Sequence, residues 1–173
     1  MLPLSHVGFT TAAVRMLEIS LRLRQIDYRI VIVSSLLPDI IDKSLLKLLE
    51  SSFTYESRAI GHSLAFLGFI GIIMAMHWLW TKNVWLLPVF LGILFHDIFD
   101  VMWLHPGIFF WPIEGWQFPA PTNEAWLGTF QFGWYKIQQR DVFDNISVWI
   151  LLYFFMKVAL KGKILEFIRT GKL

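Results

Sequence analysis

A histidine and an aspartate lie four residues apart in an otherwise apolar stretch, at His96 and Asp100. In an α-helix, side chains at this spacing project from the same face. An ionised aspartate inside a membrane helix is costly unless it is paired or binds a cation. The two side chains could therefore chelate one divalent metal ion. The alternative is a hydrogen-bonded pair that closes a contact between helices.

Two carboxylates follow a proline at the end of another apolar run. Asp39 directly follows Pro38, and Asp42 comes three residues later. Asp39 is nearer to the apolar run and is the better candidate for a buried metal ligand. Asp42 could bridge to the metal or support a ligand from behind. The alternative is a helix cap followed by a solvated acid.

A third motif opens the next apolar run, where Arg58 and His62 are also four residues apart. A guanidinium at this place can bind a phosphate through two hydrogen bonds. The alternative is an interfacial arginine that extends toward lipid headgroups. A further histidine, His6, lies before the first expected helix and by itself indicates little.

The composition defines the kind of molecule that must position these residues. The chain has 173 residues, of which 56% are hydrophobic, 17% aromatic and 16% charged. Soluble domains are about 45–50% apolar and about 25% charged. The composition therefore excludes a disordered protein and an ordinary water-soluble enzyme. The absence of cysteine excludes disulfide staples and thiolate metal sites. A net charge of +2 gives no reason to expect nucleic acid as a partner.

We expect an all-α integral membrane helical bundle that forms a single domain over residues 1–173. Three stretches have about the length and apolar character of membrane spans: residues 61–80, 84–104 and 145–160. Asp144 is expected to be the N-cap of the last one. Two shorter helices, over residues 7–23 and 26–37, bring the number of membrane-embedded helices to about five.

The first of the shorter helices carries a polar stripe, formed by Thr11, Arg15, Glu18 and Arg22. It is either an interfacial amphipathic helix or a span with a buried polar seam. Residues 103–135 are rich in aromatic residues and interrupted by proline and glycine. We expect this segment to form an interfacial loop over one end of the bundle.

Charge predicts the orientation of the bundle. Basic residues exceed acids around Lys82 and in the tail after residue 160, whereas acids exceed basic residues at the other end. Because basic loops stay in the cytoplasm, we expect an inner-membrane protein whose acidic end faces the extracytoplasmic side. His77 lies near the basic end and is interpreted as structural.

This topology brings the chemically interesting side chains to the extracytoplasmic end, with His96 about one turn, or 6 Å, deeper than Asp100. Three imidazoles and two or three carboxylates suit zinc or another divalent transition metal. The number of carboxylates favours two ions over one. The expected metal ligands are His6, Asp39, Asp42, His62, His96 and Asp100.

These motifs resemble those of the LexA-regulated inner-membrane hydrolase family. Its members are predicted membrane-bound metal-dependent hydrolases, distantly similar to zinc-dependent phospholipase C. The resemblance covers nearly the whole chain and rests on His6, Leu37-Pro38-Asp39 with Asp42, Arg58, Gly61-His62-Ser63, and His96-x-x-x-Asp100. It implies a hydrolase with a metal-activated water.

The hypothesis that follows is cleavage of a phosphoester in a phospholipid-like substrate, because the site would lie at headgroup depth in membrane lipid. Arg58 would bind the phosphate, and Asp42 would orient or deprotonate the water. One alternative is a metal ion or proton transporter, although residues 71–80 and 84–95 offer almost no polar path. Another is a non-catalytic membrane scaffold with a structural metal, whose site would be closed by protein ligands.

Overall fold

The computed structural model describes residues 3–23, 26–48, 58–118 and 133–172, which contain helices and turns but no strand. The predicted all-α class is confirmed for these residues. The elements are α1 (Pro3–Ser20), α2 (Tyr28–Ser34), α3 (Leu37–Leu48), η1 (Ile60–His62), α4 (Leu64–Thr81), α5 (Leu87–Phe99), η2 (Met102–Leu104), α6 (Pro106–Phe109), α8 (Gly133–Leu160) and α9 (Ile164–Thr170).

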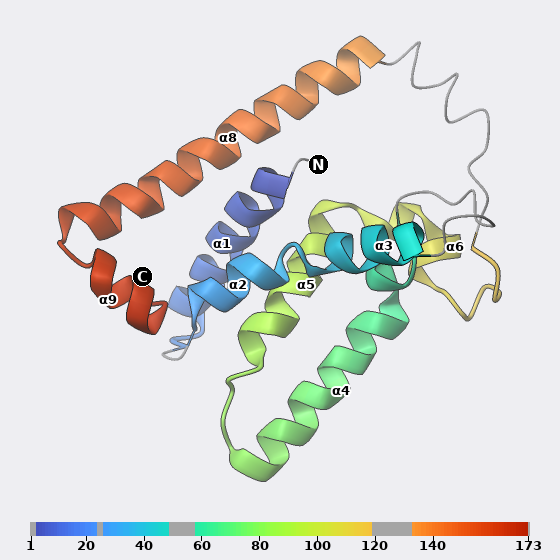
Figure 1. Cartoon of the computed structure of the whole chain (residues 1–173), viewed down its shortest axis with the longest axis horizontal. Helices are drawn as coiled ribbons and strands as arrows, with labels where there is room; N and C mark the ends of the chain where they lie inside the picture. Colours follow the sequence, from blue (N-terminus) through green and yellow to red (C-terminus); the bar gives the residue numbers. More distant parts are fainter. Residues whose placement is uncertain (1–2, 24–25, 49–57, 119–132, 173) are drawn as a thin grey trace.

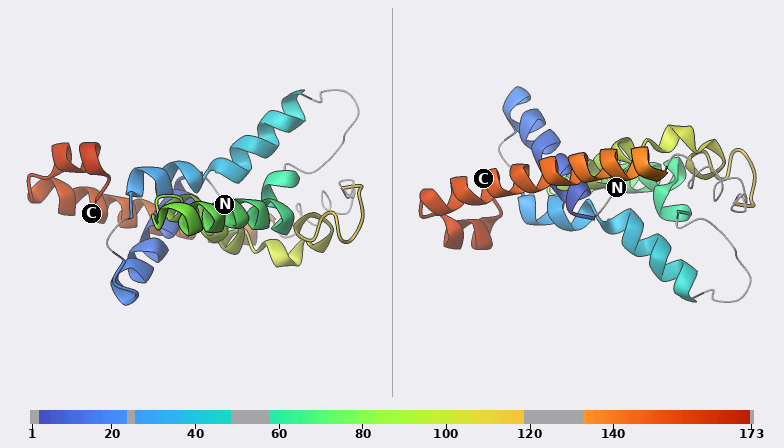
Figure 2. Two further views of the ribbon diagram at one scale, coloured as in Figure 1. Left: turned by 90° about the horizontal axis from the view of Figure 1, so that it is seen from below. Right: turned by 90° about the horizontal axis from the view of Figure 1, so that it is seen from above.

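Four helices lie side by side in the order α8, α1, α5 and α4, and α2 packs against both α1 and α5 (Figure 1). Helix α3 projects away from this group (Figure 2). The core between α1, α2 and α5 consists of Val14, Ile26, Tyr28, Val31 and Leu91. Because α1 runs antiparallel to α5, its first turn reaches the carboxyl end of α5.

Two helices are long and apolar enough to cross a membrane: Leu64–Thr81, and Val142–Leu160 within α8. They correspond to the first and third predicted spans. Each carries its apolar side chains largely outward, since only 6% and 17% of the two segments are buried inside the protein. This exposure is expected of helices that face lipid rather than a protein core.

The prediction of a span over residues 84–104 is wrong. Helix α5 has only 13 residues, which is about 20 Å of helix against a hydrocarbon core of about 30 Å. Pro88 lies in its first turn, and the chain turns after Phe99 with Val101 at a φ of 55°. The described residues therefore contain two candidate spans, fewer than the expected total of about five membrane-embedded helices.

The polar stripe of α1 is largely turned inward. Thr11 is buried, Arg15 forms an ion pair with Glu18, and Tyr28 Oη donates a 2.7 Å hydrogen bond to Glu18 Oε2. Three members of the stripe are thus buried or partly buried, whereas Arg22 is exposed. This agrees with a polar seam but not with the span that the second interpretation combined with it, because α1 is not among the candidate spans.

Small and polar residues join α1 to α8. A Cβ on Gly8 would lie 2.8 Å from the carbonyl oxygen of Ser147, so the two backbones approach closely there. Ser5 donates a hydrogen bond to the carboxylate of Asp144. The prediction that Asp144 caps the last span is wrong, because α8 already begins at Gly133.

The aromatic-rich segment is described up to Phe118 and again from residue 133. Its first part forms η2, α6 and a turn in which Trp111 stacks on Phe118 with ring centroids 5.3 Å apart. Helix α6 contacts η1, next to the candidate site. Trp103 and Trp116 are exposed. Residues 119–132 of the predicted interfacial loop lie outside the described residues, and residues 133–135 already belong to α8.

Candidate metal centre

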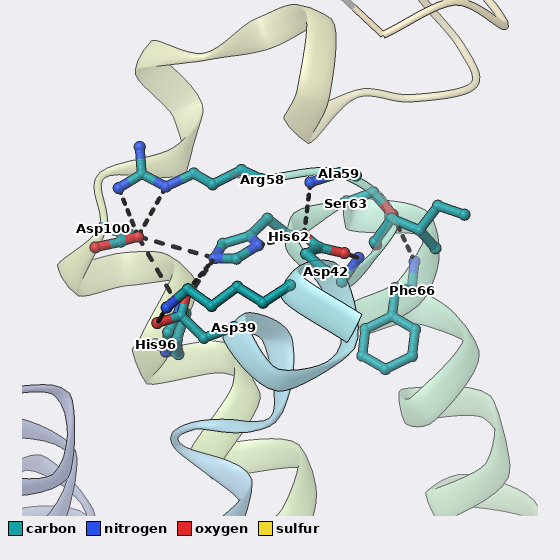
Figure 3. A network of polar contacts seen from close by, with 12 residues as sticks. Asp39, Asp42, Arg58, Ala59, His62, Ser63, Phe66, His96 and Asp100 are labelled. Atoms are coloured by element: carbon teal, nitrogen blue, oxygen red, sulfur yellow. Dashed lines mark hydrogen bonds and ion pairs between the residues drawn. The ribbon is translucent and has the colours of Figure 1, made fainter. Parts of the chain in front are cut away.

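Five of the six predicted metal ligands converge around one centre, and Figure 3 labels all of them except His6. They come from four helices and the turn that follows one of them. The side chains are His6 from α1, Asp39 from α3, His62 from η1, His96 from α5 and Asp100 after α5. The three imidazoles are each at most 1% exposed. These side chains, which the sequence placed at one end of the bundle, therefore lie close together there.

Two of the imidazoles are held in a defined tautomer. His62 Nδ1 lies 2.7 Å from Asp42 Oδ2, and His96 Nδ1 lies 2.6 Å from the carbonyl oxygen of Ser35. Carboxylates and carbonyls only accept hydrogen bonds, so Nδ1 donates in both cases. The Nε2 atom of each neutral ring therefore carries a lone pair. Metal-ligating histidines in proteins are commonly oriented in this way.

The two Nε2 atoms face each other at 3.1 Å. Two lone pairs at this distance repel unless a proton or a cation lies between them. In a tetrahedral site with Zn–N bonds of about 2.0–2.1 Å, two ligating nitrogens are about 3.4 Å apart. The geometry of His62 and His96 is therefore close to that of two ligands of one ion.

Two carboxylates complete the centre. Asp39 Oδ1 lies 3.7 Å from His62 Nε2, while its Oδ2 accepts a 2.9 Å hydrogen bond from Lys43. Asp100 turns Oδ1 toward His6 Nε2 at 3.3 Å and Oδ2 toward His62 Nε2 at 3.8 Å. The Asp100 carboxylate thus lies between His6 on one side and His62 on the other.

Arg58 closes one side of the centre. Its Nε and Nη2 atoms approach Asp100 Oδ2 at 3.0 and 2.7 Å. Burial raises the pKa of the Asp100 carboxyl, but the contacts with His6 and Arg58 outweigh burial and hold this pKa well below its usual range. Asp100 is therefore a carboxylate at neutral pH, as a metal ligand must be.

Asp42 lies behind His62 rather than among the converging atoms. Its Oδ2 accepts hydrogen bonds from His62 Nδ1 and the Ala59 amide, and its Oδ1 accepts one from the Gly61 amide at 2.7 Å. With both oxygens occupied, this fully buried carboxylate orients His62. Of the two positions considered from the sequence, the structure shows the supporting one. A direct metal contact or contact with a reacting water is not part of this geometry.

Local sequence explains how η1 reaches this position. Pro38 is the second residue of α3, where its fixed φ suits a helix start. A Cβ on Gly61 would lie 2.7 Å from the Pro38 carbonyl oxygen, so only glycine allows this approach. Ser63 then caps α4 by accepting a hydrogen bond from the Phe66 amide. His62 is thus fixed between a close contact and a helix cap.

The described residues form two possible metal-binding groups, His6 with His96 and Asp100, and Asp39 with His62 and His96. In each group the ligand atoms lie within 4.8 Å of one another. Nitrogen and carboxylate oxygen together are the donors that zinc and similar divalent ions accept. Each carboxylate is also paired with a cation, Asp39 with Lys43 and Asp100 with Arg58, but Asp39 Oδ1 and Asp100 Oδ1 still face histidine nitrogens. The converging nitrogen and oxygen donors therefore fit a divalent metal ion.

Three further residues complete the comparison with the sequence. Asp97, one residue after His96, does not join the centre, and neither of its buried oxygens has a hydrogen-bond partner among the described residues. His77 lies near the far end of α4, away from the centre. The Ser35 carbonyl was not foreseen, because a pattern of side chains carries no signal for a backbone acceptor.

Comparison with known proteins adds a family but no characterised relative. No curated protein and no solved structure matches the chain. The sequence profile of the YdjM inner membrane protein family matches residues 1–164, which includes every residue of the candidate metal centre. The two apolar helices agree with the membrane location that this family name states. The chain therefore belongs to the YdjM inner membrane protein family.

Proposed function

We propose that this inner membrane protein is a metal-dependent hydrolase that cleaves a phosphoester in a phospholipid-like substrate. The observation that carries the proposal is the convergence of the His62 and His96 Nε2 atoms at 3.1 Å, with two carboxylates beside them. Each imidazole is oriented by a protein acceptor, as in a site prepared for a metal. A pair of histidines that only joined two helices would not need both lone pairs to face each other.

The residues divide into ligands and supports. His62, His96, Asp39 and Asp100 would hold a divalent ion such as zinc, and His6 would extend the set. When bound, such an ion supplies an activated water and polarises a phosphoryl oxygen. Asp42 keeps the His62 ring turned toward the ligand set.

The arrangement of Asp100 supports two ions rather than one. His96 has a single free nitrogen, because its Nδ1 is bound to the Ser35 carbonyl. It can therefore serve only one of the two possible groups at a time. Asp100 turns one oxygen toward His6 and the other toward His62, so His6 and Asp100 would hold the second ion.

Arg58 is the residue that would bind the phosphate. Two of its nitrogens contact Asp100, whereas the remaining terminal nitrogen points away from that carboxylate (Figure 3). The Arg58 side chain is 25% exposed, against 4% for Asp100. The guanidinium thus lies at the accessible edge of the centre, where a phosphate can reach it without displacing the buried ligands.

The position of the centre favours a lipid substrate. Helix α4, a candidate span, begins two residues after His62, so the centre lies at the end of a membrane helix. Exposed tryptophans in the neighbouring turn, Trp103 and Trp116, are typical of the headgroup region. The excess of basic residues at the opposite end supports an extracytoplasmic position for this end.

Metal binding can be tested on the purified full chain in detergent. We expect one or two equivalents of zinc after dialysis, and loss of this metal in His96→Ala. The matched control is His77→Ala, which removes a histidine of α4 outside the centre and should leave the metal content unchanged. Equal metal content in wild type and His96→Ala would contradict the metal centre.

Hydrolysis is tested separately with vesicles of phosphatidylglycerol and phosphatidylethanolamine as the substrate. The release of water-soluble phosphate compounds should stop on addition of a chelator and return with zinc. Arg58→Ala should lower activity while the metal content stays the same. Activity that persists in chelator, or that is absent in the metal-loaded wild type on both lipids, would overturn the proposed reaction but leave the metal centre intact.

A further inference from the structure

A line of buried polar atoms follows α1 away from the candidate metal centre. His6, Thr10 and Thr11 are all at most 3% exposed. His6 Nδ1, the hydroxyl oxygens of the two threonines and Arg15 Nε have no hydrogen-bond partner among the described residues. Four unpartnered polar atoms on one helix need a common explanation.

Threonine in a helix usually satisfies its hydroxyl with a backbone carbonyl of the preceding turn. Elsewhere in this chain the pattern is present, since the Thr81 and Thr170 hydroxyls bond the carbonyls of His77 and Glu166. The hydroxyls of Thr10 and Thr11 do not make this bond. Buried polar groups without a protein partner are commonly satisfied by ordered water.

The spacing along α1 suits water molecules between the polar groups. His6 and Thr10 are four residues apart, as are Thr11 and Arg15, so each pair is separated by about 6 Å along the axis and lies on one side of the helix. Two hydrogen bonds of about 2.8 Å through one water molecule span at most about 5.6 Å, so one or two water molecules fit between the side chains of each pair. Thr10 and Thr11 are adjacent but rotated by about 100° around the axis, so the series of polar groups curves partway around α1 between the two pairs.

The far end of the line is also polar. The Arg15 guanidinium is paired with Glu18, and Glu18 accepts a hydrogen bond from the buried Tyr28 hydroxyl. Ionisable residues inside membrane proteins commonly mark paths for water or ions. The described helices α4 and α5 contribute only the isolated unpartnered atoms of His77 and Asp97, so the longest series of such atoms lies on α1.

We propose that these atoms line a file of buried water molecules along α1, which connects the candidate metal centre at His6 to the Arg15–Glu18–Tyr28 cluster. The file gives the centre a source of water inside the bundle, separate from the outer face. It does not depend on the proposed hydrolase function, because the unpartnered atoms are present whether or not the centre binds a metal.

Cysteine substitutions can detect this water directly, since the chain has no native cysteine. Thr10→Cys and Thr11→Cys place a thiol on the proposed file, and Val14→Cys places one in the apolar core of the same helix. All three positions are at most 3% exposed. The full chain is reconstituted in lipid vesicles and transferred to D2O, and infrared spectroscopy follows the loss of the S–H stretching band.

We expect the thiols at positions 10 and 11 to exchange at least about tenfold faster than the thiol at position 14. Equally slow exchange at all three positions would show a dry seam and overturn the proposal. Equally fast exchange would show general opening of α1 and would overturn it as well. None of these readouts requires bound metal or substrate, so failure of the proposed hydrolase activity would not affect them.

A second pair of variants covers the case in which a cysteine variant does not fold. Thr10→Val and Thr11→Val remove each hydroxyl while keeping the shape of the side chain. If the hydroxyl has no partner, its removal relieves an unsatisfied buried group and raises the melting temperature. If it binds water, its removal lowers the melting temperature. An unchanged or raised value in both variants would overturn the water file.

Discussion

At the scale of single residues, the candidate centre depends on side chains that do not touch the converging atoms. Asp42 is the clearest case, since its two oxygens accept hydrogen bonds from His62 Nδ1 and from the Ala59 and Gly61 amides. An acceptor at this place decides which nitrogen of His62 carries the proton. The position of the metal-binding lone pair is therefore set by a residue outside the ligand set.

We predict that Asp42→Asn weakens zinc binding about 10–100-fold, the range found when such supporting groups are removed. The asparagine NH2 group is a hydrogen-bond donor, and it would face His62 Nδ1 and the Ala59 or Gly61 amide, which also donate. The orientation of His62 would therefore be lost. Zinc affinity can be measured by competition with a chromophoric chelator. The control is Asp97→Asn, a similarly buried acid whose oxygens have no hydrogen-bond partner in the part of the chain that the structure describes, and it should bind zinc nearly as wild type does. Wild-type affinity in Asp42→Asn would contradict the supporting role.

The sequence predicts the members of the centre better than their contacts. Spacing places His96 and Asp100 on one face, and the ends of the apolar runs place His62 and Asp39 at the same end. These relations follow from helix geometry alone. The hydrogen bond of His62 to Asp42 depends on the short helix η1, whose rotation no periodic pattern defines. The acceptor for His96 is a backbone carbonyl, which has no sequence signal.

At the scale of elements, α2 and α5 are held together where Gly92 meets Ser34. A Cβ on Gly92 would overlap the Ser34 hydroxyl and lie 2.8 Å from its Cβ. Ser34 cannot move away easily, because its hydroxyl donates to the Ile30 carbonyl at 2.7 Å. The next residue, Ser35, supplies the acceptor for His96. The α2–α5 contact therefore supports the centre.

We predict that Gly92→Ala destabilises the protein by about 1–3 kcal/mol, the usual cost of overpacking. A fall in the melting temperature in detergent would show it, together with weaker zinc binding through the displaced Ser35 carbonyl. The control is Gly68→Ala in α4, where a Cβ would meet nothing within 4 Å. That substitution should be neutral or slightly stabilising, because alanine favours a helix more than glycine does. Equal melting temperatures for both variants would contradict the tight contact.

The start of α2 also holds the C-terminal helix α9. Asp27 caps α2 through the Arg29 amide and pairs with the Arg29 guanidinium, which donates to the Ile168 carbonyl at 2.6 Å. The Tyr28 amide donates to the Gly171 carbonyl at 2.8 Å. The hydrogen bond from Arg29 lowers the pKa of the Asp27 carboxyl below its usual value of 3.8. The charged form of Asp27 is therefore the one that stabilises this contact.

We predict that Asp27→Asn lowers stability at neutral pH and that its difference from wild type shrinks below about pH 4. Because the pKa of Asp27 is lower in the folded than in the unfolded state, its contribution is present above the unfolded pKa and is lost as pH falls through the folded pKa. Melting temperatures measured across this range test the prediction. Glu166→Gln, which breaks the exposed pair with Lys163, should have little effect at any pH. A difference that stays constant with pH would exclude the charge of Asp27 as the cause.

The elements show where sequence patterns reach their limit. Hydropathy finds the helices α4 and α8 because both are long and uniformly apolar. It also suggests a span over residues 84–104, because the turn after Phe99 is as apolar as the helix before it. A break caused by backbone conformation at Val101, a residue without special turn propensity, leaves no signal in composition.

At the scale of the whole molecule, both candidate spans run in the same direction from the candidate metal centre. Helix α4 begins next to His62 and ends at Thr81. Helix α8 passes Ser5 at Asp144, and farther along it lies beside Met16 at the other end of α1. Lys82 and Lys161 therefore follow the two spans at the end of the bundle opposite the centre.

This arrangement makes the orientation of the protein testable with three cysteine variants. Asn83→Cys and Lys161→Cys lie just beyond the two spans, and Glu114→Cys lies in the turn on the side of the centre; all three positions are exposed. Since basic loops are retained in the cytoplasm, we predict that a membrane-impermeant maleimide labels Glu114→Cys in intact cells. The other two variants should react only after the membrane is permeabilised. The reverse pattern would place the centre in the cytoplasm, and a split between positions 83 and 161 would show that only one of the two helices crosses the membrane.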